Sequence, residues 1–230
     1  MAALAVAIAA PAATASHSWG SYHWPRSSNP FTVNLGDNVS GAWDGILGEV
    51  AGDWSISDVL DTPIVAGSTA AKRCRASSGV QVCNAKYGYN GWLGLAQIWV
   101  SGSHIQKAVA KVNDSYFGLS TYNKYEAKRH VLCQEVGHTL GLDHQTSQSC
   151  MDDKNGLFDA SYMRPNGHDY DQLALIYGSH SDTTTTSSTS PSGKGLGNGE
   201  SLFVQDLGNG RKLFTWVYWA EPGAAHGPPF

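Results

Sequence analysis

Residues 130 to 151 read HVLCQEVGHTLGLDHQTSQSCM and leave this part of the chain little freedom in how it folds. They contain the spacing Gln134-Glu135-x-x-His138-x-x-Gly141-x-x-His144. Residues four apart on an α-helix point the same way, so the side chains at 134 and 138 can hold one ion, with Glu135 beside them. Gly141 favours the left-handed conformation that ends a helix sharply, and the reversal would bring His144 back toward the ion. The spacing predicts a metal site at the end of a helix.

This pattern resembles the motif of the metzincin clan of zinc metalloendopeptidases, H-E-x-x-H-x-x-G-x-x-H with a downstream methionine. The chain matches its glutamate, second histidine, glycine and third histidine. Met151 follows His144 by seven residues, an interval similar to that of the matrixin-like branch. The resemblance implies a secreted zinc endopeptidase in which Glu135 is the general base. It also implies that Met151 lies beneath the metal.

The fold that the resemblance implies is α+β. It has a twisted, mainly parallel sheet with an antiparallel edge strand, an active-site helix and a small C-terminal subdomain. The apolar, glycine-punctuated run at Gly91–Val100 suits the edge strand. An extended peptide substrate would pair with its backbone near Leu93–Val100.

Gln134 departs from the family pattern, which has its first histidine there. An amide oxygen is neutral and harder than an imidazole nitrogen, so zinc should bind more weakly or be held differently. Gln134 could be a ligand beside His138 and His144, His130 or His168 could supply the missing nitrogen, or activity could be attenuated or lost. The presence of Glu135 favours an active enzyme.

Two further functions stay open because of this departure. One is a secreted, non-catalytic metal-binding protein on a protease fold. The other is a polymer-binding protein whose function lies in the C-terminal hairpin.

The first residues have the features of a secretory signal. An apolar stretch at Ala2–Ala10 precedes the small residues Ala13-Thr14-Ala15. We therefore expect a signal peptide at 1–15 and a secreted, extracellular protein. His17 and His23, which follow, are interpreted as a flexible tail.

Four cysteines allow three disulfide pairings. Pairing Cys74 with Cys83 and Cys133 with Cys150 closes the two shortest loops. The second bond would clamp the predicted helix against Met151. An oxidising compartment favours such bonds over free thiols.

Periodicity predicts the remaining elements. We expect helices at Ala42–Trp54, Tyr125–Leu140 and Asp169–Tyr177, and strands at Phe31–Leu35, Asp58–Ala66 (interrupted by Pro63), Gly91–Val100, Ser201–Gln205 and Lys212–Ala220. His104–Tyr116 fits either an extended run or a helix.

Composition divides the chain into a metalloprotease domain at 16–180, a Ser/Thr/Gly-rich linker at 181–199 and a hairpin tail at 200–230. A lone hairpin is marginal in water, so we expect it to dock on the main domain or on a partner.

Charge and hydropathy exclude other classes of function. The net charge of −4 and the lack of a Lys/Arg cluster argue against nucleic-acid binding. No apolar run reaches the roughly 18 residues of a membrane span. We expect protein or peptide substrates, zinc as the cofactor and a monomeric chain. Cleavage specificity and calcium dependence are not readable from the sequence.

Overall fold

The structure is a computed structural model that describes residues 17–178, 182 and 201–221. The predicted signal peptide at 1–15 lies outside these residues. So do the predicted linker, apart from Asp182, and the end of the tail at 222–230.

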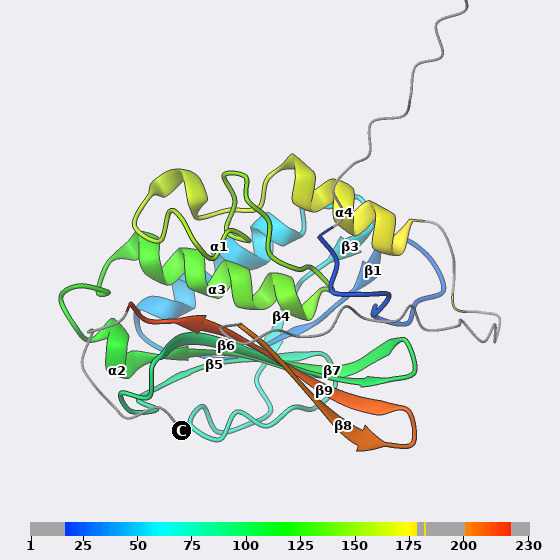
Figure 1. Ribbon diagram of the computed structural model, residues 1–230, viewed down its shortest axis with the longest axis horizontal. Coiled ribbons are helices and arrows are strands. Elements are labelled where there is room, and N and C mark those ends of the chain that lie inside the picture. Colours follow the sequence, from blue (N-terminus) through cyan, green and yellow to red (C-terminus); the bar gives the residue numbers. More distant parts are fainter. Residues whose placement is uncertain (1–16, 179–181, 183–200, 222–230) are drawn as a thin grey trace, which may run out of the picture.

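Seven strands form one sheet in the order β4-β2-β5-β7-β6-β9-β8 (Figure 1). Their bounds are Leu35–Asn38 (β2), Ile64–Ala66 (β4), Val80–Ala85 (β5), Trp92–Ser101 (β6), His104–Asn113 (β7), Leu202–Gly208 (β8) and Arg211–Trp219 (β9). Strands β4, β2, β5 and β7 are mutually parallel, whereas β6, β9 and β8 each run antiparallel to their neighbours. Phe31–Thr32 (β1) and Leu60–Asp61 (β3) form a separate parallel pair.

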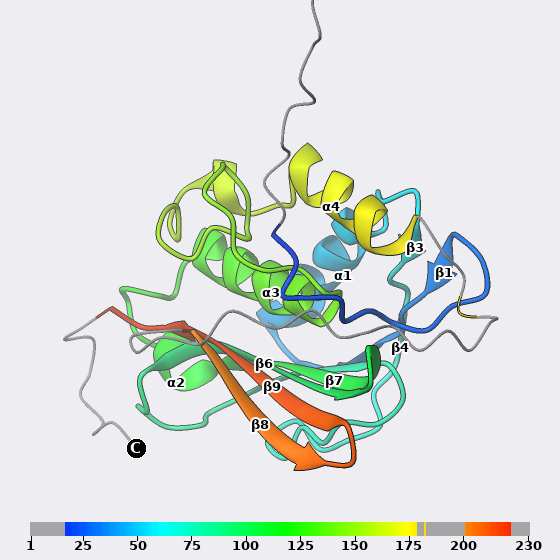
Figure 2. The same cartoon turned by 45° about the vertical axis from the view of Figure 1, so that its right-hand side comes forward.

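Three helices lie on one side of the sheet (Figure 2). They are α1 (Ala42–Trp54), α3 (Tyr125–Thr139) and α4 (Gly167–Tyr177), while α2 (Asp114–Phe117) follows β7 and a 3-10 turn, η1, covers Ala160–Tyr162. The main core fills the space between these helices and the sheet. No helix in the described ranges is both long and apolar enough to cross a membrane. The fold is mixed α+β, as the sequence predicted.

Helix α1 has the predicted bounds because its apolar residues follow the helical period. Its buried face contains Trp43, Ile46, Leu47, Val50 and Trp54. Burying each such side chain stabilises the fold by about 1.5–3 kcal/mol. At the end of this face, the Trp54 indole donates a 3.2 Å hydrogen bond to the Cys133 carbonyl of α3. Helix α1 therefore helps to fix the position of α3.

Two predicted strand regions differ from the structure in their bounds. His104–Tyr116 is extended as far as Asn113, because this run fills the gap between β5 and β6 and is paired on both sides. The predicted strand at Phe31–Leu35 is split between β1 and β2. The break expected at Pro63 does separate β3 from β4.

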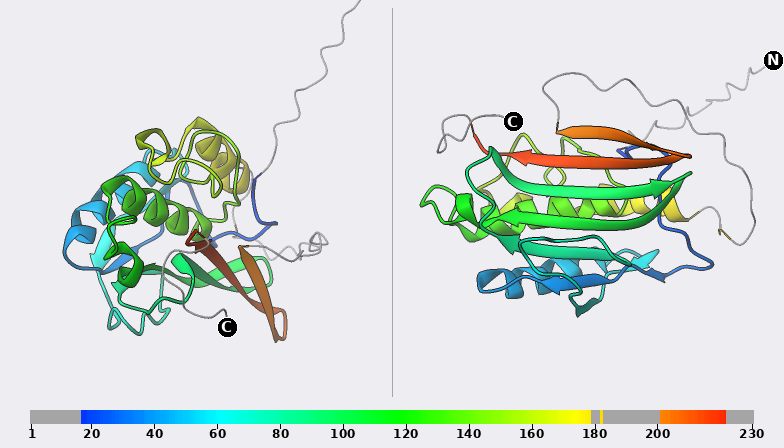
Figure 3. Two further views of the ribbon diagram at one scale, coloured as in Figure 1. Left: turned by 60° about the vertical axis from the view of Figure 1, so that its left-hand side comes forward. Right: turned by 90° about the horizontal axis from the view of Figure 1, so that it is seen from below.

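The C-terminal hairpin is present and joins the main sheet. Its turn is Asn209-Gly210, with φ of 54° and 71°, as a type I′ turn requires. Strand β9 pairs with β6 along nearly the whole length of both strands (Figure 3). The predicted antiparallel edge strand is therefore an internal strand, and the edge is β8. Local sequence patterns could not show that the exposed backbone groups of β6 are satisfied by the chain's own tail.

Candidate metal centre

Helix α3 is buried on nearly every side, yet it carries several polar side chains. Those that are 1% exposed or less include His130, Gln134, Glu135 and His138. Burying a polar group is costly unless it finds a partner, so each of these side chains requires an explanation.

Gly141 ends the helix as the sequence predicted. Its φ is +103°, the Gly141 N–H donates to the His138 carbonyl at 3.1 Å, and the Leu142 N–H donates to the Gly137 carbonyl at 3.3 Å. These two bonds form the Schellman arrangement of a helix C-terminus. A Cβ at position 141 would also lie 3.0 Å from the Tyr22 carbonyl oxygen. The reversal returns the chain toward α3 and places His144 beside His138.

The two imidazoles face each other through nitrogens that both carry lone pairs. Nδ1 of His138 lies 2.9 Å from the Leu142 carbonyl oxygen, and Nδ1 of His144 lies 3.2 Å from a carboxylate oxygen of Asp153. These oxygens only accept, so each Nδ1 carries the proton and each Nε2 is an acceptor. The two Nε2 atoms are 3.0 Å apart. Such a contact requires a shared proton or a cation.

Burial disfavours the proton. It lowers the pKa of the His138 imidazole well below its usual value, and the neighbouring His144 lowers it further. Burial also lowers the pKa of His144, although nearby carboxylates oppose the shift. Two nitrogens bound to one tetrahedral zinc at 2.0–2.1 Å would be about 3.4 Å apart, close to the spacing found.

Gln134 lies one helical turn before His138 and presents an oxygen. Its Nε2 donates to the Cys150 carbonyl at 3.0 Å, which fixes the orientation of the amide because a carbonyl cannot donate. Its Oε1 is buried and has no hydrogen-bond partner in the described part of the chain. A neutral oxygen ligand is compatible with zinc, so the residues present fit the ion that the sequence predicts.

Glu135 lies against β6. Gly94 makes room for it, because a Cβ there would be 2.5 Å from Glu135 Oε1. Neither carboxylate oxygen has a hydrogen-bond partner of ordinary geometry among the described residues. Burial raises the pKa of Glu135 well above its usual value, and the nearby backbone amides of Tyr218 and Ala96 only partly oppose this. Carboxyl groups with a pKa shifted by burial are common among catalytic acids and bases.

Both predicted disulfides are present, and one of them supports the site. Cys74 is bonded to Cys83, and Cys133 is bonded to Cys150, which fastens α3 to the segment containing Met151. Met151 is fully buried, and a Cβ at Gly137 would lie 2.4 Å from its sulfur. The methionine therefore packs on the helix backbone one residue before His138.

A residue that the sequence analysis did not assign to the site covers it. The Trp216 ring of β9 stacks on the His138 imidazole, with centroids 4.2 Å apart and planes within 6°, and lies 5.0 Å from His144. Phe214, Trp216 and Tyr218 alternate along β9 and are all buried. That alternation was a signal that one face of the tail packs on the main domain.

The other candidate ligands have different partners. Both ring nitrogens of His130 face carbonyl oxygens, those of Gly156 at 3.3 Å and Asp152 at 3.0 Å. His168 lies 3.1 Å from a ring nitrogen of His17. Neither is placed beside His138 and His144.

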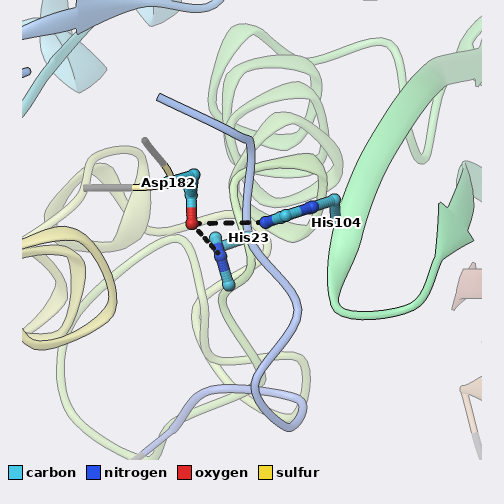
Figure 4. A group of neighbouring side chains, drawn as sticks. All are labelled: His23, His104 and Asp182. Carbon is cyan, nitrogen blue, oxygen red and sulfur yellow. Dashed lines mark hydrogen bonds and ion pairs between the residues drawn. The ribbon is translucent and has the colours of Figure 1, made fainter. Parts of the chain in front are cut away.

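A second group of histidines contains His23, near the start of the described chain, and His104, the first residue of β7 (Figure 4). Ligand atoms of His23, His104 and Asp182 lie within 4.8 Å of one another, close enough to hold one ion. Asp182 already has a cationic partner in Arg26. The buried Arg26 guanidinium is 3.4 Å from it, and the His104 and His23 imidazoles are 3.2 and 3.4 Å away. Burial raises the pKa of Asp182, but the Arg26 backbone N–H and these imidazoles outweigh it and bring the pKa to about 2.

The interpretation of His17 and His23 as a flexible tail was wrong. Both are buried. The His17 ring lies 3.1 Å from an Asp169 carboxylate oxygen, and its backbone N–H donates to the side chain of Gln172 at 3.0 Å. These partners are about 150 residues away, so local composition could not reveal them.

No protein-family model and no curated protein matches the chain. Among solved structures, it is similar to archaemetzincin from Archaeoglobus fulgidus, at 12% identity and a TM-score of 0.35, over 62% of this chain and 98% of that one. A similarity at that TM-score supports no conclusion about function, so any such conclusion depends on the geometry of the site.

Proposed function

We propose that this chain is a zinc-dependent endopeptidase of metzincin type, similar to the matrixin-like branch, in which Gln134, His138 and His144 hold the metal. The observation that carries the proposal is the 3.0 Å contact between two lone-pair nitrogens. The buried, unpartnered oxygen of Gln134, one helical turn away, supports it. Secretion remains part of the proposal, and the two disulfides are consistent with an oxidising compartment.

Zinc, when bound, supplies Lewis acidity that acidifies water and polarises a peptide carbonyl. Glu135 accepts the proton of the attacking water as the oxygen adds to the carbonyl carbon. It then delivers that proton to the amide nitrogen as the C–N bond breaks. Leu142 and Asp153 hold the two imidazoles in the tautomer that directs Nε2 to the ion.

The test is hydrolysis of an unfolded protein by the chain from Ser16 onward, beside its Glu135→Gln variant, with zinc content measured on both. Glutamine keeps the shape of the side chain but cannot accept the proton. We expect hydrolysis that a chelator stops, and a decrease of about 10²–10⁴-fold in the variant at equal zinc content. Equal rates in the two proteins would contradict the role of Glu135.

The second candidate is a non-catalytic metal- or polymer-binding protein. Trp216 over the imidazoles favours it, as do the exposed aromatic rings of Phe203 and Trp219 on the hairpin. Zinc binding without hydrolysis, also when the covering ring is removed, would support this function instead.

A further inference from the structure

Strand β6 is the part of the sheet beside the metal centre. Glu135 of α3 packs against its Gly94, and the Ala96 backbone lies close to the same carboxyl group. Without β9, the outer side of β6 would present a row of unpaired backbone N–H and C=O groups. Extended peptides bind such sheet edges by adding a strand.

That position is filled by β9. The pairing is antiparallel and runs from Ser101 opposite Arg211 to Trp92 opposite Trp219. The Val217 N–H donates to Ser201 at 2.7 Å, so its backbone faces β8, and the alternate residues of β9 face β6. A peptide from this chain therefore lies where an extended substrate would lie.

The side chains of β9 complete the cover. Trp216 is 3% exposed and stacks on His138, and the Ser201 hydroxyl lies 3.4 Å from Nδ1 of His144. The Trp216 indole nitrogen is buried without a hydrogen-bond partner among the described residues. The Trp216 ring therefore packs on the His138 imidazole although its own N–H group makes no hydrogen bond with these residues.

The hairpin is held almost entirely through β9. Its far end is tied by the Ala220 N–H to the Gly91 carbonyl at 2.7 Å and by the Glu221 N–H to the Tyr122 hydroxyl at 2.9 Å. Strand β8, in contrast, is exposed along most of its length, with Phe203 at 52%. An incoming strand must therefore displace the β6–β9 pairing together with the buried β9 side chains Phe214, Trp216 and Tyr218.

We propose that β6 and the metal centre form a binding surface for extended peptides, and that β9 is its intramolecular occupant, which inhibits the site with Trp216 as the covering residue. This proposal rests on the proposed function. It adds that substrate must displace β9, so hydrolysis is slow while the hairpin is docked.

The first variant removes the covering ring. We expect Trp216→Ala to increase kcat/KM on an unfolded protein about tenfold or more. Trp219→Ala is the matched control, since this tryptophan is on the same strand but 41% exposed and away from the imidazoles. It should change kcat/KM less than twofold. Near-ultraviolet circular dichroism verifies that both variants fold.

The second variant locks the hairpin. Gln97 of β6 lies opposite Thr215 of β9 in a non-hydrogen-bonded pair. In such a pair the two Cβ atoms lie close together. A Gln97→Cys/Thr215→Cys protein should form a disulfide on the sheet face opposite α3. Oxidised, it should hydrolyse substrate at least tenfold more slowly than after mild reduction. The wild type, treated with the same reductant, controls for the native disulfides.

Loss of zinc to EDTA is followed on the same proteins, because it reports access to the site without requiring catalysis. The proposal is supported if hydrolysis and zinc loss are both faster in Trp216→Ala and both slower in the oxidised Gln97→Cys/Thr215→Cys protein. If zinc loss follows this order but no variant hydrolyses, β9 covers the site and the peptidase function fails. If the rates are alike in all variants, the proposal is overturned, and hydrolysis by the wild type would leave the peptidase function standing.

Discussion

Two groups of histidines in this chain differ in the charged groups around them. His138 and His144 turn lone pairs toward each other, and the carboxylate of Asp153 contacts the other nitrogen of the His144 ring. His23 and His104 both face one carboxylate, Asp182 (Figure 4). The same carboxylate also contacts the buried Arg26. We propose that the first group binds a cation from outside, whereas the second already contains the Arg26 guanidinium.

Proximity of ligand atoms alone would not separate these groups. The two groups differ in whether their acceptors have donors. The Nε2 atoms of His138 and His144 face each other, whereas the Asp182 carboxylate is paired. A buried acceptor without a donor is costly and a paired one is not. We therefore propose zinc binding for the first group and a structural role for the second, as a clasp that joins His23 of the N-terminal segment, His104 at the start of β7 and Asp182, five residues after the end of α4.

The largest expected difference is in zinc content. His138→Ala should lose its single equivalent of zinc after dialysis against micromolar zinc, because one of two imidazole ligands is gone. His104→Ala should keep the full equivalent. Elemental analysis measures the zinc content of both variants, and loss of zinc from His104→Ala would contradict binding at His138 and His144.

The carboxylates that contact the two groups of histidines, Asp153 and Asp182, should also differ in their effect on zinc affinity. Asp153→Ala removes the acceptor that orients His144 and should weaken zinc binding about 10–100-fold, as loss of such partners does. Asp182→Ala should leave zinc affinity unchanged. Competition with a zinc-sensitive dye measures both, and Asp153→Asn, which retains an acceptor, should lie between Asp153→Ala and the wild type.

A smaller change in the opposite direction is expected at Gln134. Gln134→His supplies an imidazole in place of a neutral oxygen and should tighten zinc binding by about tenfold. The same dye competition tests it. Weaker binding would mean that the orientation set by the Cys150 carbonyl does not suit a histidine.

The smallest effect concerns stability of the clasp. Asp182 has a folded pKa of about 2, below the roughly 3.9 of an unfolded aspartate. A lowered pKa means that its stabilisation is complete above pH 4 and is lost as the pH falls toward 2. Allowing for solvent screening, Asp182→Asn should lower the free energy of unfolding by about 1 kcal/mol at pH 5 and by less near pH 2.

Urea unfolding of the wild type and Asp182→Asn between pH 5 and pH 2 measures that difference. A gap that widens with acid would contradict the ion pairing of Asp182 with Arg26 and the two imidazoles.

The sequence predicted the parts of the site that depend on local geometry. The spacing from Gln134 to His144 sets side-chain direction on α3 and the turn at Gly141, and both follow from helix periodicity and the conformational freedom of glycine. The disulfide to Cys150 followed from the choice of the shortest loops. Helix α1 was predicted to the residue for the same reason of periodicity.

The parts that sequence analysis did not find depend on contacts between distant residues. Trp216 lies 78 residues after His138, and no pattern within the hairpin states which surface it will cover. His23 reaches Asp182 across 159 residues. The assignment of β6 as the sheet edge was wrong for the same reason, since its last partner comes from the C-terminal tail.

Anomalous diffraction at the zinc edge, from crystals of the full chain grown with zinc, tests the central claim most directly. We expect one peak, about 2.0–2.2 Å from Nε2 of His138, Nε2 of His144 and Oε1 of Gln134. A peak among His23, His104 and Asp182, with none beside His138, would contradict it.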